Sequence, residues 1–363
     1  PTVFTSARLA PETAPVAAGC DVASVFVNDD VGAESVAALA RAGVTHISLR
    51  CAGYDNVDLQ AAAAAGITVT RVPTYSPASV AEHALALTLA LARNVARAVA
   101  RCKESNYELS GLVGFQLRGK TVGIVGTGAI GTCAAAAFHG LGCRVVAFDP
   151  NPSPAARPYC SYVPTLDRLL AESDVVSLHV PLLPSTHHMI NKESISRMKH
   201  GAVLVNVSRG ALIDTPAVLD GLQSGRVGGL ALDVYERGGG GGGGARRVVG
   251  RGPPTPLPYP SQPSSMRTWA RSSPPTGCTS STEVLGWWRG WGRAGPNPLK
   301  GKTDPETVLS TEFAILQSLP NVVVTPHCAF LTTEALGEIG RTVAANIQDV
   351  AAGRPCANEV KAR

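Results

Sequence analysis

The chain has 363 residues, 45% of them hydrophobic and 16% charged, so it is long enough to build two domains with cores of their own. Its longest apolar run, 84–92, is too short to span a bilayer and is followed at once by Arg93, which argues against a membrane protein. The net charge is +5, but the segment 237–302 holds ten of the 32 basic residues and one of the 27 acidic ones. The 22 basic and 26 acidic residues elsewhere argue against a nucleic-acid-binding protein.

The nine cysteines are scattered, with no Cys-x-x-Cys and no His/Cys cluster at metal spacing, so we expect reduced thiols and no metal site. The chain opens on Pro1 without an initiator Met, and its first segment enters a fold already under way. We therefore interpret it as an N-terminal fragment that lacks its first strand. The cytoplasm is the default compartment, and an organellar targeting peptide would be invisible in this sequence.

Residues 1–76 alternate short β-rich runs with helical patterns. Strands are expected at 22–27, 46–49 and 67–72, and helices at 33–42 and 57–65. This alternation predicts a parallel sheet covered on both faces, in a small flavodoxin-like α/β domain. Residues 330–363 are expected to complete this substrate domain, with a helix at 332–351 that is capped by Thr332 and Thr333 and packs back on it.

An Ala/Leu/Val-rich run at 77–104 begins with Pro and predicts one long helix that links two domains. Arg93, Arg97 and Arg101 are four residues apart, which places them along one helix face. The simplest interpretation of that face is a solvated basic stripe. The same region is our candidate for an interface between two copies of the chain.

Residues 77–329 contain a second, larger domain. Strands are expected at 121–125, 144–148, 175–180, 203–207, 230–234 and 322–325, and helices between them at 133–141, 166–172, 192–198 and 216–223. Six strands with crossover helices predict a doubly wound parallel sheet of the Rossmann type. Ligands of such a sheet bind at the carboxyl ends of the strands, so we seek the chemistry just after each strand.

The first of these strands runs into G-x-G-x-x-G, formed by Gly126, Gly128 and Gly131. The first glycine permits the turn, the second lets the backbone approach a pyrophosphate, and the third lets the helix pack on the strand. The motif alone is a weak signal, but here it has both strands, the helix and Asp149 in the expected places. Asp149 would accept hydrogen bonds from an adenosine ribose and repel a 2′-phosphate, so the sequence predicts NAD rather than NADP. Ala129 and Ile130, inside the loop, belong to the same predicted site.

Other strands end in polar residues. His179-Val180-Pro181, Arg209, Asp233 and His327 each follow a predicted buried strand. One such residue could arise by chance, but an Arg, an Asp and a His at three strand ends indicate a reaction site.

Six segments resemble the D-isomer-specific 2-hydroxyacid dehydrogenases and, within that family, its D-lactate branch. They are RCAGYDNVDL (50–59), YSPASVAEHA (75–84), the loop 126–131, VNVSRGALID (205–214), LDVYE (232–236) and TPHCAFLTTEA (325–335). The likeness covers 20–236 and 303–359 in the right order. The run AFLT at 329–332 is the part that resembles the lactate branch.

The resemblance implies roles for individual residues. Arg209 would pair with the substrate carboxylate through its planar, permanently charged fork and contact the 2-oxo group. His327 would be the general acid in keto reduction and the base in oxidation, since an imidazole titrates near pH ~6.5. A lone His is more often a core residue, so this role rests on position and matched neighbours. No comparable claim to this role comes from the other histidines, which are those at 46, 83, 139, 187, 188 and 200.

Further positions follow from the same resemblance. Ala52 and Gly53 would offer backbone amides to the substrate carboxylate, and Tyr75 would close over a small substrate. Asp233 would contact the nicotinamide carboxamide. The apolar side of the cofactor site is assigned to Val180, Pro181 and Val207.

The pattern breaks two positions after Glu236. Where the family has a Glu that hydrogen-bonds the catalytic His, this chain has Gly238, and loss of that carboxylate is expected to cost on the order of 10² to 10⁴ in rate. A run of glycines begins at Gly238, inside the segment 237–302. The composition of this segment cannot build a packed core. A functional disordered insert and a lineage-specific loop both stay open. We favour translated non-coding sequence, which a tryptic peptide recovered from within 252–293 would contradict.

The sequence therefore predicts an NAD-dependent D-lactate dehydrogenase of fermentative type, which transfers hydride reversibly between NADH and pyruvate. Its partner would be a small 2-oxo or 2-hydroxy acid, with no nucleic acid and no membrane, and the resemblance implies a homodimer or higher homo-oligomer. Two alternatives stay open: an enzyme for another D-2-hydroxy acid, and a catalytically impaired product that only binds the cofactor.

Overall fold

Residues 3–236 and 311–362 are described by the computed structural model, and they contain two parallel sheets. The smaller sheet has the order β1-β2-β3 (Val22–Val25, His46–Leu49 and Thr68–Thr70), connected through α1 (Ala33–Arg41) and α2 (Leu59–Ala64). Both strand pairs are parallel, as the alternation of strands and helices predicts. Within the described residues no helix is long and apolar enough to cross a membrane.

The larger sheet has seven parallel strands in the order β10-β9-β8-β7-β4-β5-β6. These are β4 (Thr121–Val125), β5 (Arg144–Phe148), β6 (Ser161–Tyr162), β7 (Val175–Leu178), β8 (Ala202–Asn206), β9 (Val227–Leu232) and β10 (Val322–Val324). The strand order reverses at β4, which pairs with β5 on one side and with β7 on the other. The doubly wound sheet is thus confirmed, and the reversal marks the crevice where such sheets bind ligands.

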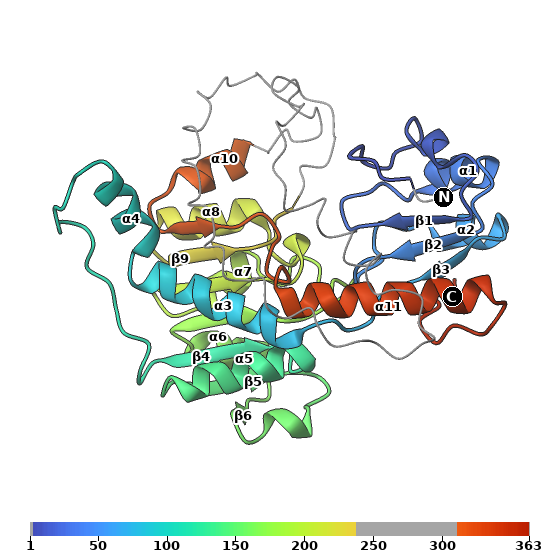
Figure 1. Ribbon diagram of the computed structural model, residues 1–363. Coiled ribbons are helices and arrows are strands. Elements are labelled where there is room, and N and C mark those ends of the chain that lie inside the picture. The colour runs from blue at the N-terminus through green and yellow to red at the C-terminus, as the bar shows by residue number, and fades with distance from the viewer. Residues whose placement is uncertain (1–2, 237–310, 363) are drawn as a thin grey trace, which may run out of the picture. The chain divides into compact units, whose positions relative to one another are not determined.

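Helices cover both faces of the larger sheet (Figure 1). One face carries α3 (Pro77–Ala92) and α5 (Ala129–Gly140), and the other carries α6 (Leu166–Glu172), α7 (Lys192–Arg197), α8 (Thr215–Gln223) and α10 (Thr311–Ser318). Each face of the sheet has its own apolar core, and strand residues alternate between the two. Val203 and Val205 belong to the core beneath α3 and α5, and Ala202 and Leu204 belong to the core on the other face. Because successive side chains point to opposite faces, a strand covered on both sides is an unbroken apolar run.

The C-terminal helix α11 (Thr333–Ala351) is the long helix expected there. Thr332 caps it by accepting a hydrogen bond from the N–H of Ala335 at 3.2 Å. The helix contacts β2, and Asn346 Nδ2 donates to the carbonyl of Arg71 at 2.9 Å. The end of the chain therefore packs against the smaller sheet, while the domain boundaries themselves stay a prediction.

The single helix expected at 77–104 is wrong, because the chain forms two helices there. α3 ends at Ala92 and α4 runs over Val95–Lys103. Asn94, between them, has a left-handed backbone (φ +51), which breaks a right-handed helix and which Asn adopts more readily than most residues. Its side-chain amide donates to the carbonyl oxygen of Val113 at 3.2 Å.

Two of the three arginines expected to form a solvated basic stripe on this helix contact backbone carbonyls instead. Arg97 Nη1 donates to the carbonyl oxygen of Gly111 at 3.1 Å, and Arg101 Nη1 donates to that of Ser110 at 2.7 Å. Both guanidinium groups therefore hold the segment that follows α4. Arg93 is the C-cap of α3 instead of a member of the same face.

Several short elements carry too little pattern to be read from the sequence. β6 has two residues and pairs with β5 at the sheet edge. Three 3₁₀ turns, η1 (Ala14–Ala17), η2 (Pro154–Ala156) and η3 (Gly210–Leu212), and the helix α10 were not expected either. The segment 237–302 lies outside the described residues.

Candidate active site

The glycine loop (126–131) joins β4 to α5 where the strand order reverses. Gly126 has φ +91, and a Cβ there would collide with the carbonyl of His179 at the end of β7. A Cβ on Gly131 would collide with the carbonyl oxygen of Gly126. Gly131 therefore lets α5 lie close to the end of β4, Gly126 lets the loop pass close to the end of β7, and the strand, turn and helix are arranged as the motif predicts.

A hollow of about 440 Å³ opens beside the start of α5. Gly128 lines it, and a Cβ on this residue would meet no atom within 4 Å, so the space in front of it is open. Ala129, the first residue of α5, also lines the hollow, and Ile130 beside it packs on the core. Open space at the N-terminus of a 12-residue helix suits a pyrophosphate, so the residues present fit a dinucleotide.

Asp149 stands on the rim of this hollow, one residue after β5. Its Oδ2 accepts hydrogen bonds from the N–H of Thr127 at 2.6 Å and from its hydroxyl at 3.1 Å, and Oδ1 accepts from the N–H of Asn151 at 2.8 Å. These bonds orient the carboxylate from behind. Thr127 sits between two glycines of the motif, and only its contact with Asp149 marks it as part of the site.

The end of β7 forms the neighbouring wall. Val180 lies against Gly126, and Pro181 after it is exposed. Val207, directly after β8, is buried at 7% exposure. Burial lowers the pKa of His179 to about 4, and its Nε2 lies 2.9 Å from the hydroxyl of Ser177. His179 is therefore neutral at pH 7 and part of the wall.

Arg209 follows β8, and the turn that presents it is shaped by Asn206. This fully buried side chain accepts from the N–H of Ser208 at 3.0 Å and donates to the carbonyl of Arg209 at 2.8 Å. The Arg209 side chain is 35% exposed, with Nε donating to Asp55 Oδ2 at 3.0 Å and Nη1 to the carbonyl of Ser208 at 2.9 Å. Asn206 and Asp55 both lie in segments that carry the family resemblance, but neither was assigned a role from the sequence.

The loop after β2 lies against this guanidinium. A Cβ on Gly53 would collide with Arg209 Nη2, so the guanidinium lies against the backbone of Gly53 and a larger residue there would displace it. The carbonyl of its neighbour Ala52 accepts from Arg71 Nη1 at 3.0 Å. Burial raises the pKa of Cys51 to about 12 although Arg209 lowers it, so this thiol stays protonated and is no nucleophile.

Tyr75 belongs to the same neighbourhood. Burial raises its pKa and the nearby charge of Arg209 lowers it, which places the phenol within electrostatic reach of the guanidinium. Its ring meets Phe330 edge-on with centroids 6.1 Å apart, and Phe330 lies 5.4 Å from Phe26. Phe26 was not identified from the sequence, because an apolar residue after a strand resembles any core residue. The structure thus places Gly53 against Arg209, with Tyr75 within reach of the charge of that guanidinium.

His327 lies in the histidine loop (325–329), which follows β10. Its backbone is left-handed (φ +58), and its N–H donates to the carbonyl of Thr325 at 3.0 Å. Asp233 accepts hydrogen bonds on both sides of it: from the Thr325 hydroxyl at 2.5 Å, and from the N–H groups of Cys328 at 2.9 Å and Ala329 at 2.8 Å. One buried carboxylate therefore clamps the whole loop.

Asp233 itself is fully buried at the end of β9. Burial acts to raise the pKa of Asp233, but the hydrogen bonds from His83, Thr325 and the two loop amides outweigh it and hold the pKa well below its usual range. The carboxylate is thus ionised at neutral pH. Its contact with a nicotinamide carboxamide stays a prediction, since the described contacts all go to the protein.

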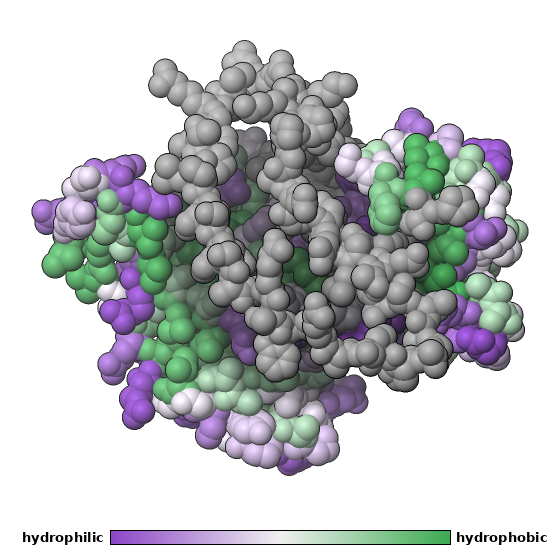
Figure 2. Space-filling view, in the orientation of Figure 1, coloured by the Kyte–Doolittle hydropathy of each residue, from purple (hydrophilic) through white to green (hydrophobic). Residues whose placement is uncertain are grey.

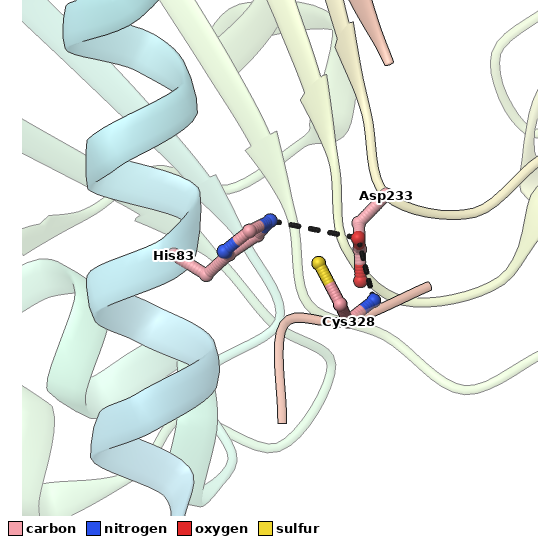
Figure 3. Close-up of side chains that lie close together, drawn as sticks. All are labelled: His83, Asp233 and Cys328. Atoms are coloured by element: carbon pink, nitrogen blue, oxygen red, sulfur yellow. Dashed lines mark hydrogen bonds and ion pairs between the residues drawn. The ribbon is translucent and has the colours of Figure 1, made fainter. Parts of the chain in front are cut away.

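His83 is the residue that sequence reasoning missed here. It projects from α3 toward Asp233 and Cys328 (Figure 3), with Nε2 3.5 Å from Asp233 Oδ1 and 3.0 Å from the hydroxyl oxygen of Thr325. Its position in an apolar helix gave it no claim over five other histidines. Only the packing of α3 across β9 and β10 brings it to the loop.

Two groups of possible metal ligands form in the described part of the chain, and sequence spacing revealed neither. They are His83, Asp233 and Cys328, and His187, His188 and Glu236, each with ligand atoms within 4.8 Å of one another. In the second group His188 Nε2 lies 3.0 Å from Glu236 Oε1, an ordinary ion-pair contact. Gly238, the position of the expected catalytic Glu, lies outside the described residues.

Comparison with known proteins identifies the family to which this chain is similar. Residues 85–261 match the family described as D-isomer specific 2-hydroxyacid dehydrogenase, NAD binding domain. The chain is 39% identical to D-lactate dehydrogenase kk1H of Curvularia clavata, over 98% of this chain and 85% of that protein. Among solved structures, the pyruvate reductase of Chlamydomonas reinhardtii has a TM-score of 0.77 and 44% identity, covering 98% of this chain and 90% of that one. A D-lactate dehydrogenase from Aquifex aeolicus, complexed with NAD and lactic acid, has a TM-score of 0.69 and 29% identity, covering 96% and 89%.

Proposed function

This chain belongs to the D-isomer specific 2-hydroxyacid dehydrogenase family of NAD-dependent enzymes, and we propose that within it the protein interconverts pyruvate and D-lactate. Its relatives named D-lactate dehydrogenase and pyruvate reductase support this substrate. The observation that carries the proposal is the guanidinium of Arg209 lying on the backbone of Gly53, with Tyr75 within reach of its charge. A fixed cation next to packed aromatic rings suits a carboxylate whose other substituent is as small as a methyl group.

Different residues of the chain then have separate roles in the reaction. Arg209 binds the substrate carboxylate, assisted by the backbone of Ala52 and Gly53, and orients the 2-oxo group. The bound nicotinamide supplies the hydride in reduction and accepts it in oxidation. His327 donates the proton that the keto oxygen needs to become a hydroxyl, and takes it back in the reverse direction. Pyruvate, NADH and one proton thus become D-lactate and NAD⁺.

Other residues hold the cofactor or exclude water. The glycine loop would bind the pyrophosphate and Asp149 the adenosine ribose. Val180, Pro181 and Val207 would form the apolar side of the nicotinamide site. Tyr75 would cover the substrate, which keeps water from competing for Arg209.

Substitution of the two reacting residues tests this assignment. Arg209→Lys keeps the charge but loses the planar fork, so kcat/KM for pyruvate should fall at least ~100-fold, mainly through KM. His327→Asn should lower kcat by about 10²- to 10⁴-fold with NADH affinity retained. Arg97→Lys, in α4, is the matched control. Pyruvate reduction that is unchanged in either site variant would contradict the proposal.

A panel of 2-oxo acids with NADH tests the substrate. We expect kcat/KM to fall from pyruvate through 2-oxobutyrate to 2-oxoisocaproate and phenylpyruvate, and a chiral assay should find the D-isomer of lactate. A preference for the bulkier acids would assign the enzyme to another member of the substrate class.

A second candidate follows from Gly238, which stands where the family has its catalytic Glu. The chain would then bind NADH without useful turnover. NADH binding by fluorescence, compared with pyruvate reduction on the same sample, separates the two candidates. Gly238→Glu should raise kcat if the missing carboxylate is what limits the enzyme.

We also propose that two copies of the chain pair through the region 77–104. Figure 2 shows apolar surface near α4, where Val95 and Val99 are 46% and 49% exposed. Exposed apolar side chains of this kind mark protein interfaces. Sedimentation should give a dimer or larger oligomer, and Val99→Glu should shift it toward the monomer; a monomeric parent protein would exclude this pairing.

A further inference from the structure

We propose that His83 is a positioning residue for the histidine loop, and that it acts through a hydrogen-bond relay from His83 to Thr325 to Asp233. The three residues come from α3, from the end of β10 and from the end of β9. Figure 3 shows His83 and Asp233 pointing toward one another across this junction. The relay ends on the loop that carries His327.

The histidine loop needs a clamp because its central residue is in an unfavourable conformation. A left-handed backbone costs a non-glycine residue roughly 1–2 kcal/mol, and His327 has φ +58. Three hydrogen bonds from the residues on both sides offset that cost, and these three end on the carboxylate of Asp233. Whatever orients this carboxylate therefore orients the loop.

The direction of the relay follows from the donors that are available. Asp233 is ionised, so it can only accept. Thr325 has a single hydroxyl hydrogen, and the 2.5 Å contact with Asp233 Oδ1 uses it. The remaining 3.0 Å contact between Thr325 Oγ1 and His83 Nε2 must then be donated by the imidazole. The geometry therefore requires a proton on Nε2 of His83.

The placement of His83 suits a fixed role. Asp233 is a fully buried anion, and the described ion pair that it forms is with His83, whose side chain is 23% exposed. Helix α3 contacts β8, β9 and β10, so its imidazole joins the helix layer to two strand ends at once. A buried carboxylate with a donor on each face is held in one orientation, because every alternative orientation leaves a donor unpaired.

The same side chains could instead bind a metal ion, since the ligand atoms of His83, Asp233 and Cys328 lie within 4.8 Å of one another. Two facts favour the hydrogen-bonded relay. Both oxygens of Asp233 already accept donors from the loop, and a metal would have to displace them. Burial, together with the adjacent charge of Asp233, raises the pKa of Cys328, so its thiol is not the thiolate that metals bind.

Two measurements on the full-length protein test the relay without using catalysis. Ring-nitrogen NMR of ¹⁵N-histidine-labelled protein, with the His83 signal assigned by its loss in a variant, should show a protonated Nε2. Amide hydrogen exchange of Cys328 and Ala329 should quicken roughly five- to tenfold in His83→Leu, the effect of losing one hydrogen bond. In His83→Gln, which keeps a donor near the same place, most of that protection should return.

Controls separate positioning from general damage. His200→Leu removes an exposed histidine in the turn before β8 and should leave the loop amides unchanged. Exchange in β4 should not respond to any of these variants. If His83→Leu fails to fold, Thr325→Val should give the same faster exchange and Thr325→Ser should restore protection. An unprotonated Nε2, or loop exchange in both His83→Leu and Thr325→Val that equals the parent's, would overturn the relay, as would stoichiometric Zn²⁺ binding that is lost in His83→Gln and in Cys328→Ser.

The kinetic consequence rests on the proposed role of His327. A loosened loop should lower kcat for pyruvate about tenfold in His83→Leu, with the Kd for NADH unchanged and partial recovery in His83→Gln. Faster exchange without a change in kcat would keep the relay and count against His327 as the acid–base group. Unchanged exchange would count against the relay whatever the rates.

Discussion

Two loops at the carboxyl ends of the larger sheet are held in place by contacts of different range. The glycine loop is shaped by its own glycines: Gly131 permits the approach of α5 to a carbonyl only five positions earlier, and Gly126 takes a backbone that other residues avoid. The histidine loop is held by a carboxylate from β9 and an imidazole from α3, which are 92 and 242 residues away from Thr325.

This difference separates two kinds of functional information. A loop that depends on its own residues appears in the sequence as a motif, because Gly126 needs a left-handed backbone and Gly131 meets a carbonyl five positions earlier. A loop that depends on distant partners appears only as a lone His, and its support is invisible until the strands and α3 are packed. The glycine loop also joins a wide hollow, whereas the histidine loop is clamped from the buried side.

The largest effect is expected at the clamp. Asp233→Asn replaces an acceptor with an amide whose NH₂ would face the loop N–H groups, so unfolding should become easier by about 3–4 kcal/mol. Urea unfolding measures this, with Asp220→Asn on the exposed side of α8 as the control. A loss below ~1 kcal/mol would mean that the loop holds itself as the glycine loop does.

The stability of the parent protein and that of Asp233→Asn should also respond differently to acid. The pKa of Asp233 is lowered in the folded state, so its stabilising effect is fully present above the ordinary carboxylate pKa of ~3.9 and is lost as the pH falls below that. The difference in stability between the parent protein and Asp233→Asn should therefore be constant from pH 7 to about 5 and shrink toward pH 3. A difference that does not vary with pH would show that the charge of Asp233 is not what holds the loop.

The next effect is expected at the glycine loop. Gly128 has open space in front of it and no positive φ, so Gly128→Ala should fold as stably as the parent protein. The added methyl group fills part of the hollow where the pyrophosphate is expected, and NADH should bind roughly 30-fold more weakly, about 2 kcal/mol. Gly140→Ala, at the far end of α5 and equally open, is the control and should leave NADH affinity unchanged. Equal NADH affinity in the Gly128 and Gly140 variants would remove the glycine loop from the cofactor site.

The smallest effect is expected from mild acid acting on His179, which lies against Gly126 of the glycine loop. Burial lowers the pKa of His179 to about 4 from an ordinary ~6.5, so the unfolded chain binds the proton first and the stability associated with neutral His179 is lost as the pH falls from ~6.5 toward ~4. Over the single pH unit from ~6 to ~5, His179→Gln should flatten this decline by about 1 kcal/mol. His46 in the smaller sheet, with its pKa also lowered to about 4 by burial, should contribute a similar decline of its own, which His46→Gln would remove. An unchanged decline in His179→Gln would show that the wall does not respond to acid in this range.

The sequence by itself determined the alternation of strands and helices, the doubly wound sheet, and the glycine loop with Asp149 at its rim. Each of these depends on a period of two or 3.6 residues, or on glycines at a fixed spacing between a strand and a helix. It also placed Arg209 and His327 at strand ends, because buried apolar runs that stop at a charged residue are visible in one dimension. It did not show that Asn94 ends α3, since the Ala/Leu pattern continues past it.

Only the tertiary structure decided which residues hold these side chains. Asp55 meets the guanidinium of Arg209 across 154 positions, and His83 reaches the histidine loop because α3 crosses β9 and β10. Neither contact has a spacing or a composition that marks it. The direction of a hydrogen bond depends on which donors and acceptors meet. His83, Thr325 and Asp233 meet only when α3 and the ends of β10 and β9 are packed together.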